Sequence, residues 1–166
     1  MRSIRLLALA VAAALVAPGC SDGGAKVSAT MNANASPSAG LPANPLQWRV
    51  ITSAINKHDS TMWTLYGNDT AVDFTRTQAH QDYPAGSQLS LVTWTQRDDP
   101  RYFGARIPDR VKSVEFVLVS AAPDGHPSYS YAQYEGASQT KSSTQEGLTP
   151  NDRTTYLLSQ RPAVMP

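Results

Sequence analysis

The sequence has a single cysteine, Cys20, among 166 residues, and it has neither cysteine nor histidine from Gly136 to Pro166. One thiol cannot form an intramolecular disulfide, and it cannot form the C-x-x-C-H motif that attaches c-type haem. The formal net charge is only +1, so composition gives no electrostatic reason to expect nucleic acid or an anionic surface as a partner. The sequence also lacks a phosphate-binding loop, an H-E-x-x-H zinc motif and a Ser/His/Asp signature, so the enzyme classes that use them have no motif support.

Long apolar runs are also scarce, and the longest, Leu6 to Ala17, lies near the N-terminus. It follows Arg2 and Arg5 and is too short to span a bilayer comfortably. This pattern is typical of a secretory signal peptide, which we place over residues 1–19. The alternative is a buried N-terminal helix.

Cys20 follows Ala17-Pro18-Gly19, which resembles the bacterial lipobox, in which the cysteine is diacylated and becomes the mature N-terminus. We therefore expect a palmitate-type anchor on Cys20, in which each buried methylene contributes about 0.8 kcal/mol. Ser21 after the cysteine favours, by the same resemblance, the outer membrane of a bacterial cell envelope, with the protein facing the periplasm. The alternative is an ordinary secreted protein with a free thiol. Residues 20–43 are rich in Gly, Ser, Ala, Asn and Pro and are expected to form a flexible tether.

Residues 44–160 are enough for one core and predict an α+β domain, an antiparallel sheet of four to five strands with two or three helices. The stretch from Gln88 to Gln96 is rich in β-branched and aromatic residues, with Val92 and Trp94 on one face, and predicts a strand. Asn68 is suited to cap a helix that runs to about Ala79. Further strands are expected at 61–66, 113–120 and 129–134, a short helix or irregular segment over 46–55, a terminal helix at 152–159, and a frayed tail at 161–166.

The residues L-Y-G-N-D-T-A-V from Leu65 and Y-P-A-G-S-Q-L-S-L-V-T-W from Tyr83 resemble the cytochrome P-460 family, small periplasmic proteins whose relatives include the cytochromes c prime-beta. The resemblance continues through V-K-S-V-E-F-V-L-V and Y-S-Y-A-Q-Y-E-G, so it covers roughly Pro45 to Gly136. It implies a haem attached through C-x-x-C-H after the last aromatic strand, and in some members a lysine crosslinked to the haem. This chain lacks the motif, and Leu91 is the nearest match to the lysine.

Histidines are few, and His58, His80 and His126 each lie at or near an aspartate, so three loops could converge on a metal. None of the three pairs has a compact ligand spacing. We therefore expect surface histidines, no metal site and no cofactor. Non-covalent haem held by one of these histidines or by Met62 is the alternative.

Aromatic side chains are expected on or beside the sheet, where a haem-sized hollow without haem could accept a flat or apolar small ligand. The competing interpretation is that the aromatics fill this hollow themselves as core. The residues concerned are Trp63, Trp94, Tyr129, Tyr131 and Tyr134.

These observations favour a membrane-anchored, periplasm-facing lipoprotein whose haem-less domain is a binding or interaction module and not an enzyme. One alternative is a haem-binding redox protein that handles nitrogen oxides or hydroxylamine, as the family resemblance implies. Another is a purely structural envelope protein.

Overall fold

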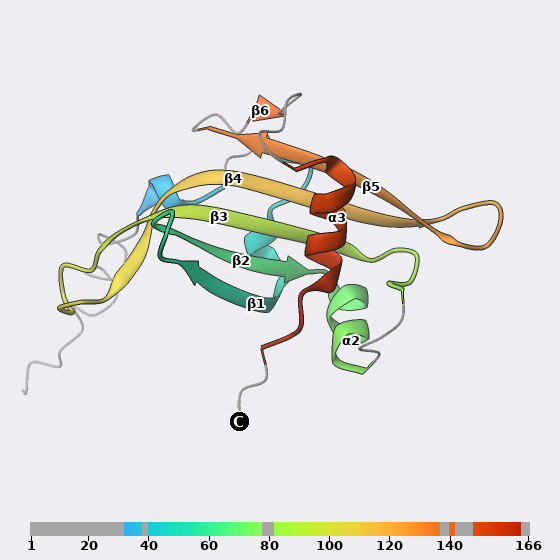
Figure 1. Cartoon of the computed structure of the whole chain (residues 1–166), viewed down its shortest axis with the longest axis horizontal. Helices are drawn as coiled ribbons and strands as arrows, with labels where there is room; N and C mark the ends of the chain where they lie inside the picture. Colours follow the sequence, from blue (N-terminus) through green and yellow to red (C-terminus); the bar gives the residue numbers. More distant parts are fainter. Residues whose placement is uncertain (1–31, 38–39, 78–81, 137–139, 142–147, 164–166) are drawn as a thin grey trace, which may run out of the picture. The chain divides into compact units, whose positions relative to one another are not determined.

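The computed structural model of this chain describes residues 32–37, 40–77, 82–136, 140–141 and 148–163. One sheet of six antiparallel strands runs in sequence order, so every strand pairs with its neighbours along the chain (Figure 1). The predicted α+β class is therefore confirmed, but the sheet has more strands than the four or five expected. The strands are β1 (Arg49–Asn56), β2 (Thr61–Gly67), β3 (Gln88–Asp98), β4 (Arg106–Ala121), β5 (Pro127–Glu135) and β6 (Thr140–Lys141).

The prediction of a helix or irregular segment over 46–55 was wrong. A short 3-10 turn, η2 (Pro45–Gln47), leads into the edge strand β1. The register of β1 against β2 shifts between Val50 and Thr52, and this irregularity turns Ile51 into the core, where it is 3% exposed. Gly67, which pairs with Arg49 on β1, leaves room for this side chain, because a Cβ on Gly67 would lie 2.8 Å from Ile51 Cδ1.

The two faces of the sheet carry separate cores, because side chains alternate along each strand. On one face, which we call the helix face, Leu65, Leu89 and Val117 pack against α2 (Asp69–Thr77) and α3 (Pro150–Ser159). On the other, which we call the segment face, Val92, Trp94, Val114 and Phe116 form the core. Residues from the chain before β1 cover the segment face, namely Ala35, Leu41, Ala43 and Trp48.

Most of this covering segment lies inside the predicted tether. The compact unit spans Asn32–Pro166, and the 3-10 turn η1 (Ala33–Ala35) falls within residues 20–43. The indole Nε1 of Trp94 donates a hydrogen bond of 2.8 Å to the backbone oxygen of Ala35. The predicted signal peptide, Cys20 and the part of the predicted tether up to residue 31 lie outside the described residues.

The predicted helix starts are close to the observed ones. The Asn68 side chain accepts a hydrogen bond of 3.0 Å from the Ala71 N–H and so caps α2, while the predicted end at Ala79 lies outside the described residues. Thr149 and Asp152 form a reciprocal capping box at the start of α3. The tail is not frayed at its beginning, because the Ala163 N–H donates a hydrogen bond of 2.9 Å to the Ile51 oxygen.

Candidate functional site

A charged residue is buried in the middle of the helix face. Glu115 lies on β4 opposite Leu91 of β3 and Gln133 of β5, and it is 3% exposed. Because a buried carboxylate is costly unless it is paired and hydrogen-bonded, its partners identify the part of the fold that depends on it.

The main partner is Arg153, on the face of α3 that lies on the sheet. Its guanidinium donates from Nε to Glu115 Oε2 over 2.9 Å and from Nη2 to Glu115 Oε1 over 2.6 Å. This is a two-point contact, in which the planar fork of the arginine matches both oxygens of the carboxylate. Arg153 also lies over the Tyr156 ring, with 4.9 Å between the guanidinium carbon and the ring centroid.

The pair continues into β5 through a tyrosine and a glutamine. The Tyr131 hydroxyl lies 2.7 Å from Glu115 Oε2 and 2.9 Å from Gln133 Oε1. Gln133 Nε2 in turn donates to the Glu135 carboxylate. We call Glu115, Tyr131, Gln133 and Arg153 the Glu115 network; it joins β4, β5 and α3 across the sheet surface.

Burial and pairing change the ionisation of this network in consistent directions. Burial raises the pKa of Tyr131, and the hydrogen bond to the Glu115 carboxylate raises it further. Burial alone would lower the pKa of Arg153, but hydrogen bonds and attraction to Glu115 outweigh it, so the pKa of Arg153 is raised. The network therefore holds a neutral phenol against a carboxylate and a guanidinium that neutralise each other.

The chemistry available to this arrangement is structural. Both oxygens of the Glu115 carboxylate accept hydrogen bonds from donors within the network, namely Arg153 and Tyr131. Helix α3, which carries Arg153, lies over this carboxylate. A carboxylate held in this way is not presented to a substrate. Its effect is to fix α3 on the sheet at one orientation, since a two-point contact constrains both partners.

The sequence analysis did not identify the Glu115 network, although a signal exists. Glu115 is the one charged residue within S-V-E-F-V-L-V-S, an otherwise apolar strand, and such a residue needs a partner. Arg153 is 38 positions away along the chain, so only the fold shows that it is that partner.

The structure divides the predicted aromatic residues between the two faces. Trp63 and Tyr131 pack against the helix-face core, and Trp63 meets Tyr156 of α3 edge to face at 6.4 Å. Trp94 and Tyr134 belong to the segment face. They therefore do not line one common hollow, and Tyr129 is 36% exposed on β5.

The predicted iron and metal ligands are also apart. The His58 side chain is 95% exposed in the turn after β1, where its Nδ1 lies 2.7 Å from Asp59 Oδ1, and this hydrogen bond raises the pKa of His58. His126 is in the β4–β5 turn, at the other end of the antiparallel sheet, and Met62 packs on the segment face. His80 lies outside the described residues. Within the part of the chain that the structure describes, no three His, Cys, Asp or Glu residues lie close enough to hold a metal ion.

These positions do not fit the haem that the family resemblance implies. The stretch after β5, where the resemblance places haem attachment, leads to α3, which carries neither a thiol nor an imidazole. Leu157 of α3 is fully buried in the helix-face core, and the Glu115 network joins the same helix to the sheet beside it. The described residues thus offer neither the ligands nor a free surface there.

Comparison with known proteins identifies one family. No curated protein matches the sequence. The family model described as Cytochrome P460 matches residues 42–151, which is more than half of the chain and spans β1 to the start of α3, including Glu115, Tyr131 and Gln133 but not Arg153. The chain therefore belongs to the Cytochrome P460 family.

Proposed function

We propose that this chain is a lipid-anchored protein of the bacterial envelope whose Cytochrome P460 family domain carries no haem and acts as a binding or interaction module. The observation that carries the proposal is the Glu115–Arg153 ion pair between the sheet and α3. It holds the last helix onto the sheet through side chains alone.

The missing ligands support the haem-less state. The only cysteine, Cys20, lies far before the sheet, and the stretch after β5 has neither cysteine nor histidine. Thioether attachment needs two thiols, and axial ligation at the family's position needs an imidazole. Neither requirement is met by the residues of this chain.

The anchor is supported by the sequence around Cys20. The proposal of acylation rests on Ala17-Pro18-Gly19-Cys20 after an apolar run. Asn32, where the compact unit starts, follows Cys20 by twelve residues. Two or more acyl chains on one residue would hold the protein on the membrane. None of the helices in the described ranges is long and apolar enough to cross a bilayer.

A haem titration tests the haem-less state. The purified protein is mixed with ferric haem and the Soret region is recorded before and after extensive dialysis. We expect no stable absorbance band, because the two described histidines are exposed and far apart and Met62 packs, partly buried, against the segment-face core.

A matched triple variant, His58→Ala, His126→Ala and Met62→Leu, separates a built site from surface adsorption. Weak binding that the triple variant loses and dialysis removes would be adsorption on exposed side chains. A one-to-one complex that survives dialysis in the wild-type protein would instead favour the haem-binding redox alternative and contradict the proposal.

A further inference from the structure

The β3–β4 turn, residues 99–105, exposes two large aromatic side chains that the core does not use. Tyr102 is 69% exposed and Phe103 is 110% exposed, so both rings stand in solvent. A contiguous exposed apolar group of this kind marks a contact site more often than a lone surface residue does. We call residues 99–105 the hairpin tip.

The hairpin tip is held in shape by its own hydrogen bonds. The Asp99 N–H donates to the Ala105 oxygen over 3.0 Å, and the Asp99 side chain accepts a bond of 2.8 Å from the Arg101 N–H. Gly104 has a φ of +78°, which lets the chain turn back directly after Phe103. The rings are therefore presented by a closed turn.

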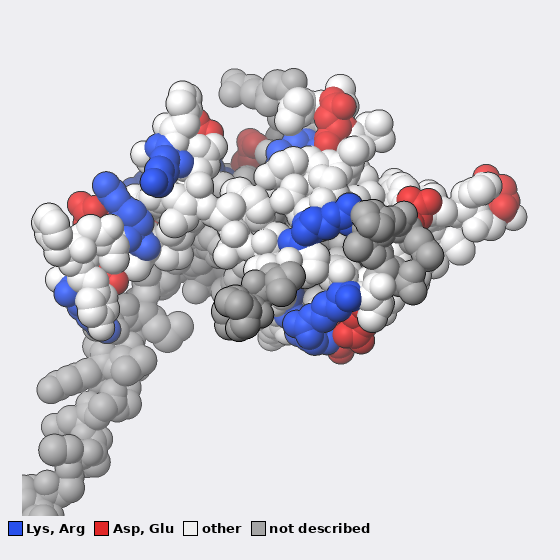
Figure 2. Space-filling model, turned by 60° about the horizontal axis from the view of Figure 1, so that its bottom comes forward, with Lys and Arg blue, Asp and Glu red and all other residues white. Residues whose placement is uncertain are grey.

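The flanks of the hairpin tip are basic, although the net charge of the whole chain is small. Residues 97–112 contain five Arg and Lys against three Asp, which gives a local charge of +2. Arg106 and Arg97 pair with aspartates, whereas the Arg101 guanidinium has no ion-pair partner within the described part of the chain. In Figure 2, Lys and Arg side chains gather at the left, over the end of the sheet that carries the hairpin. The basic residues are Arg97, Arg101, Arg106, Arg110 and Lys112.

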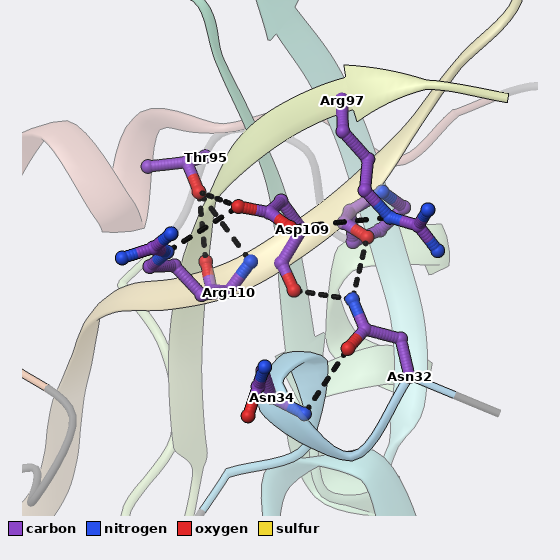
Figure 3. A network of polar contacts seen from close by, with 7 residues as sticks. Asn32, Asn34, Thr95, Arg97, Asp109 and Arg110 are labelled. Carbon is purple, nitrogen blue, oxygen red and sulfur yellow. Dashed lines mark hydrogen bonds and ion pairs between the residues drawn. The ribbon is translucent and has the colours of Figure 1, made fainter.

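Asn32, the first described residue after Cys20, lies at the base of this same hairpin. The Asn32 side chain donates to the Pro108 oxygen over 3.2 Å and also to the Asp109 oxygen (Figure 3). Asp109 is itself held by Arg97 and Arg110, so Asn32 is fixed on β4. The last residue pair before the turn is Asp98 with Arg106, and Pro108 lies two residues beyond Arg106. Two residues span about 7 Å along a strand.

Covalent reach then limits where an acyl anchor can be. Cys20 precedes Asn32 by twelve residues, and a chain of that length spans at most about 40 Å in any conformation. A membrane that holds the acyl chains is thus within reach of the end of the sheet from which Tyr102 and Phe103 project. Aromatic rings are favoured at the level of lipid head groups, and arginines are attracted to anionic lipids.

We propose that the hairpin tip docks on the surface of the phospholipid bilayer, with Phe103 and Tyr102 among the head groups and Arg101 on anionic phosphates. This inference rests on the proposed acylation of Cys20, which supplies the membrane. Docking would orient the sheet with its β3–β4 end toward the bilayer and its β4–β5 turn away from it. The β4–β5 turn, which contains His126, would then face away from the membrane.

For the test, the protein is expressed with its own N-terminal segment so that it can be exported and acylated. It is then reconstituted in vesicles of phosphatidylethanolamine and phosphatidylglycerol that contain brominated lipid. A Phe103→Trp variant places an indole on the hairpin tip, and its emission is read as the difference from the wild-type spectrum. A Tyr129→Trp variant is the matched control, since Tyr129 is an exposed aromatic near the other end of the sheet. We expect a blue shift and quenching by brominated lipid for Phe103→Trp and neither for Tyr129→Trp.

Adding Arg101→Gln to Phe103→Trp should lower the ratio of docked to undocked protein by about fivefold, the effect of one basic residue near an anionic surface. The inference is overturned if the indole introduced at position 103 is not quenched and keeps the emission maximum of an indole exposed to water. A blue shift without quenching also overturns it, because a protein surface and not lipid would then cover the tip.

Mass spectrometry of the same samples separates the two proposals. An acylated protein with an unquenched tip keeps the proposed anchor and removes the docking inference. An unacylated protein whose tip is quenched when vesicles are added keeps the docking inference and removes the anchor. An unacylated, unquenched protein removes both.

Discussion

The two faces of the sheet are covered by different kinds of contact. On the helix face, α3 is fixed by the buried Glu115–Arg153 ion pair. On the segment face, the covering chain is held by edge-to-face rings, with 6.1 Å between the Trp48 and Phe116 centroids, and by the Trp94 hydrogen bond. Loss of one partner on the helix face leaves an uncompensated charge, whereas the same loss on the segment face leaves a small void or one free carbonyl. The faces should therefore respond differently to mutation and to pH.

The largest expected effect is on the helix face. Arg153→Ala leaves the Glu115 carboxylate buried without its main partner, and we expect the free energy of unfolding to fall by about 3–5 kcal/mol. Urea denaturation measures this loss. Arg49→Ala is the matched control, because Arg49 pairs with Asp73 on the surface at 3.0 Å and such pairs contribute no more than about 1 kcal/mol.

Removing both charges sharpens the interpretation. The double variant Glu115→Leu with Arg153→Met replaces the ion pair by apolar side chains of similar length, and we expect it to recover stability to within about 1–2 kcal/mol of the wild-type protein. Tyr131 keeps its hydroxyl contact of 2.9 Å to Gln133 in that variant. If the double variant were as unstable as Arg153→Ala, the unpaired charge would not be the cause.

A smaller effect is expected on the segment face. Trp94→Phe keeps an aromatic ring in the core but removes the hydrogen bond to the Ala35 oxygen, which should cost about 1–2 kcal/mol. Because this bond fastens the covering segment, we also expect faster proteolytic cleavage within residues 32–43. Trp63→Phe on the helix face is the control for loss of an indole, and it should leave the cleavage rate unchanged. Equal cleavage in both variants would show that the hydrogen bond does not hold the segment.

The smallest effect is the contribution of the Tyr131 hydroxyl, which also distinguishes the faces by pH. At neutral pH, Tyr131→Phe should cost about 1 kcal/mol. Because the folded pKa of Tyr131 lies above its ordinary value of 10.0, this contribution is fully present below pH 10 and is lost as pH rises through the folded pKa. The difference in unfolding free energy between wild type and variant should therefore shrink above pH 10. A difference that grows with pH would contradict the direction of the shift.

The sequence was sufficient where local patterns and the fold agree. The alternation of Leu89, Leu91 and Thr93 with Val92 and Trp94 predicted both the β3 strand and its two faces, and the segment face now shows Trp94 in its core. It failed at β1, because an edge strand has only one residue, Ile51, fully buried and its apolar positions happen to fall at helical spacing.

Long-range contacts account for the other differences. The residues around Ala35 are small and polar in composition, so nothing local predicts that they cover Trp94, whose hydrogen bond spans 59 positions. In the same way, Glu115 and Arg153 are 38 positions apart in the sequence, and only the fold brings α3 over β4. The absence of the haem motif, by contrast, is a property of the sequence itself and needed no structure.

Native mass spectrometry of the protein extracted from its own membrane tests the central claim most directly. We expect one species whose mass equals the chain from Cys20 onward plus acyl groups, with no added mass of haem. A species that carries one haem per chain through extraction would contradict this claim. It would mean that residues other than a C-x-x-C-H motif bind the iron in this domain. The Glu115–Arg153 pair would then not be the contact that holds α3 without a cofactor.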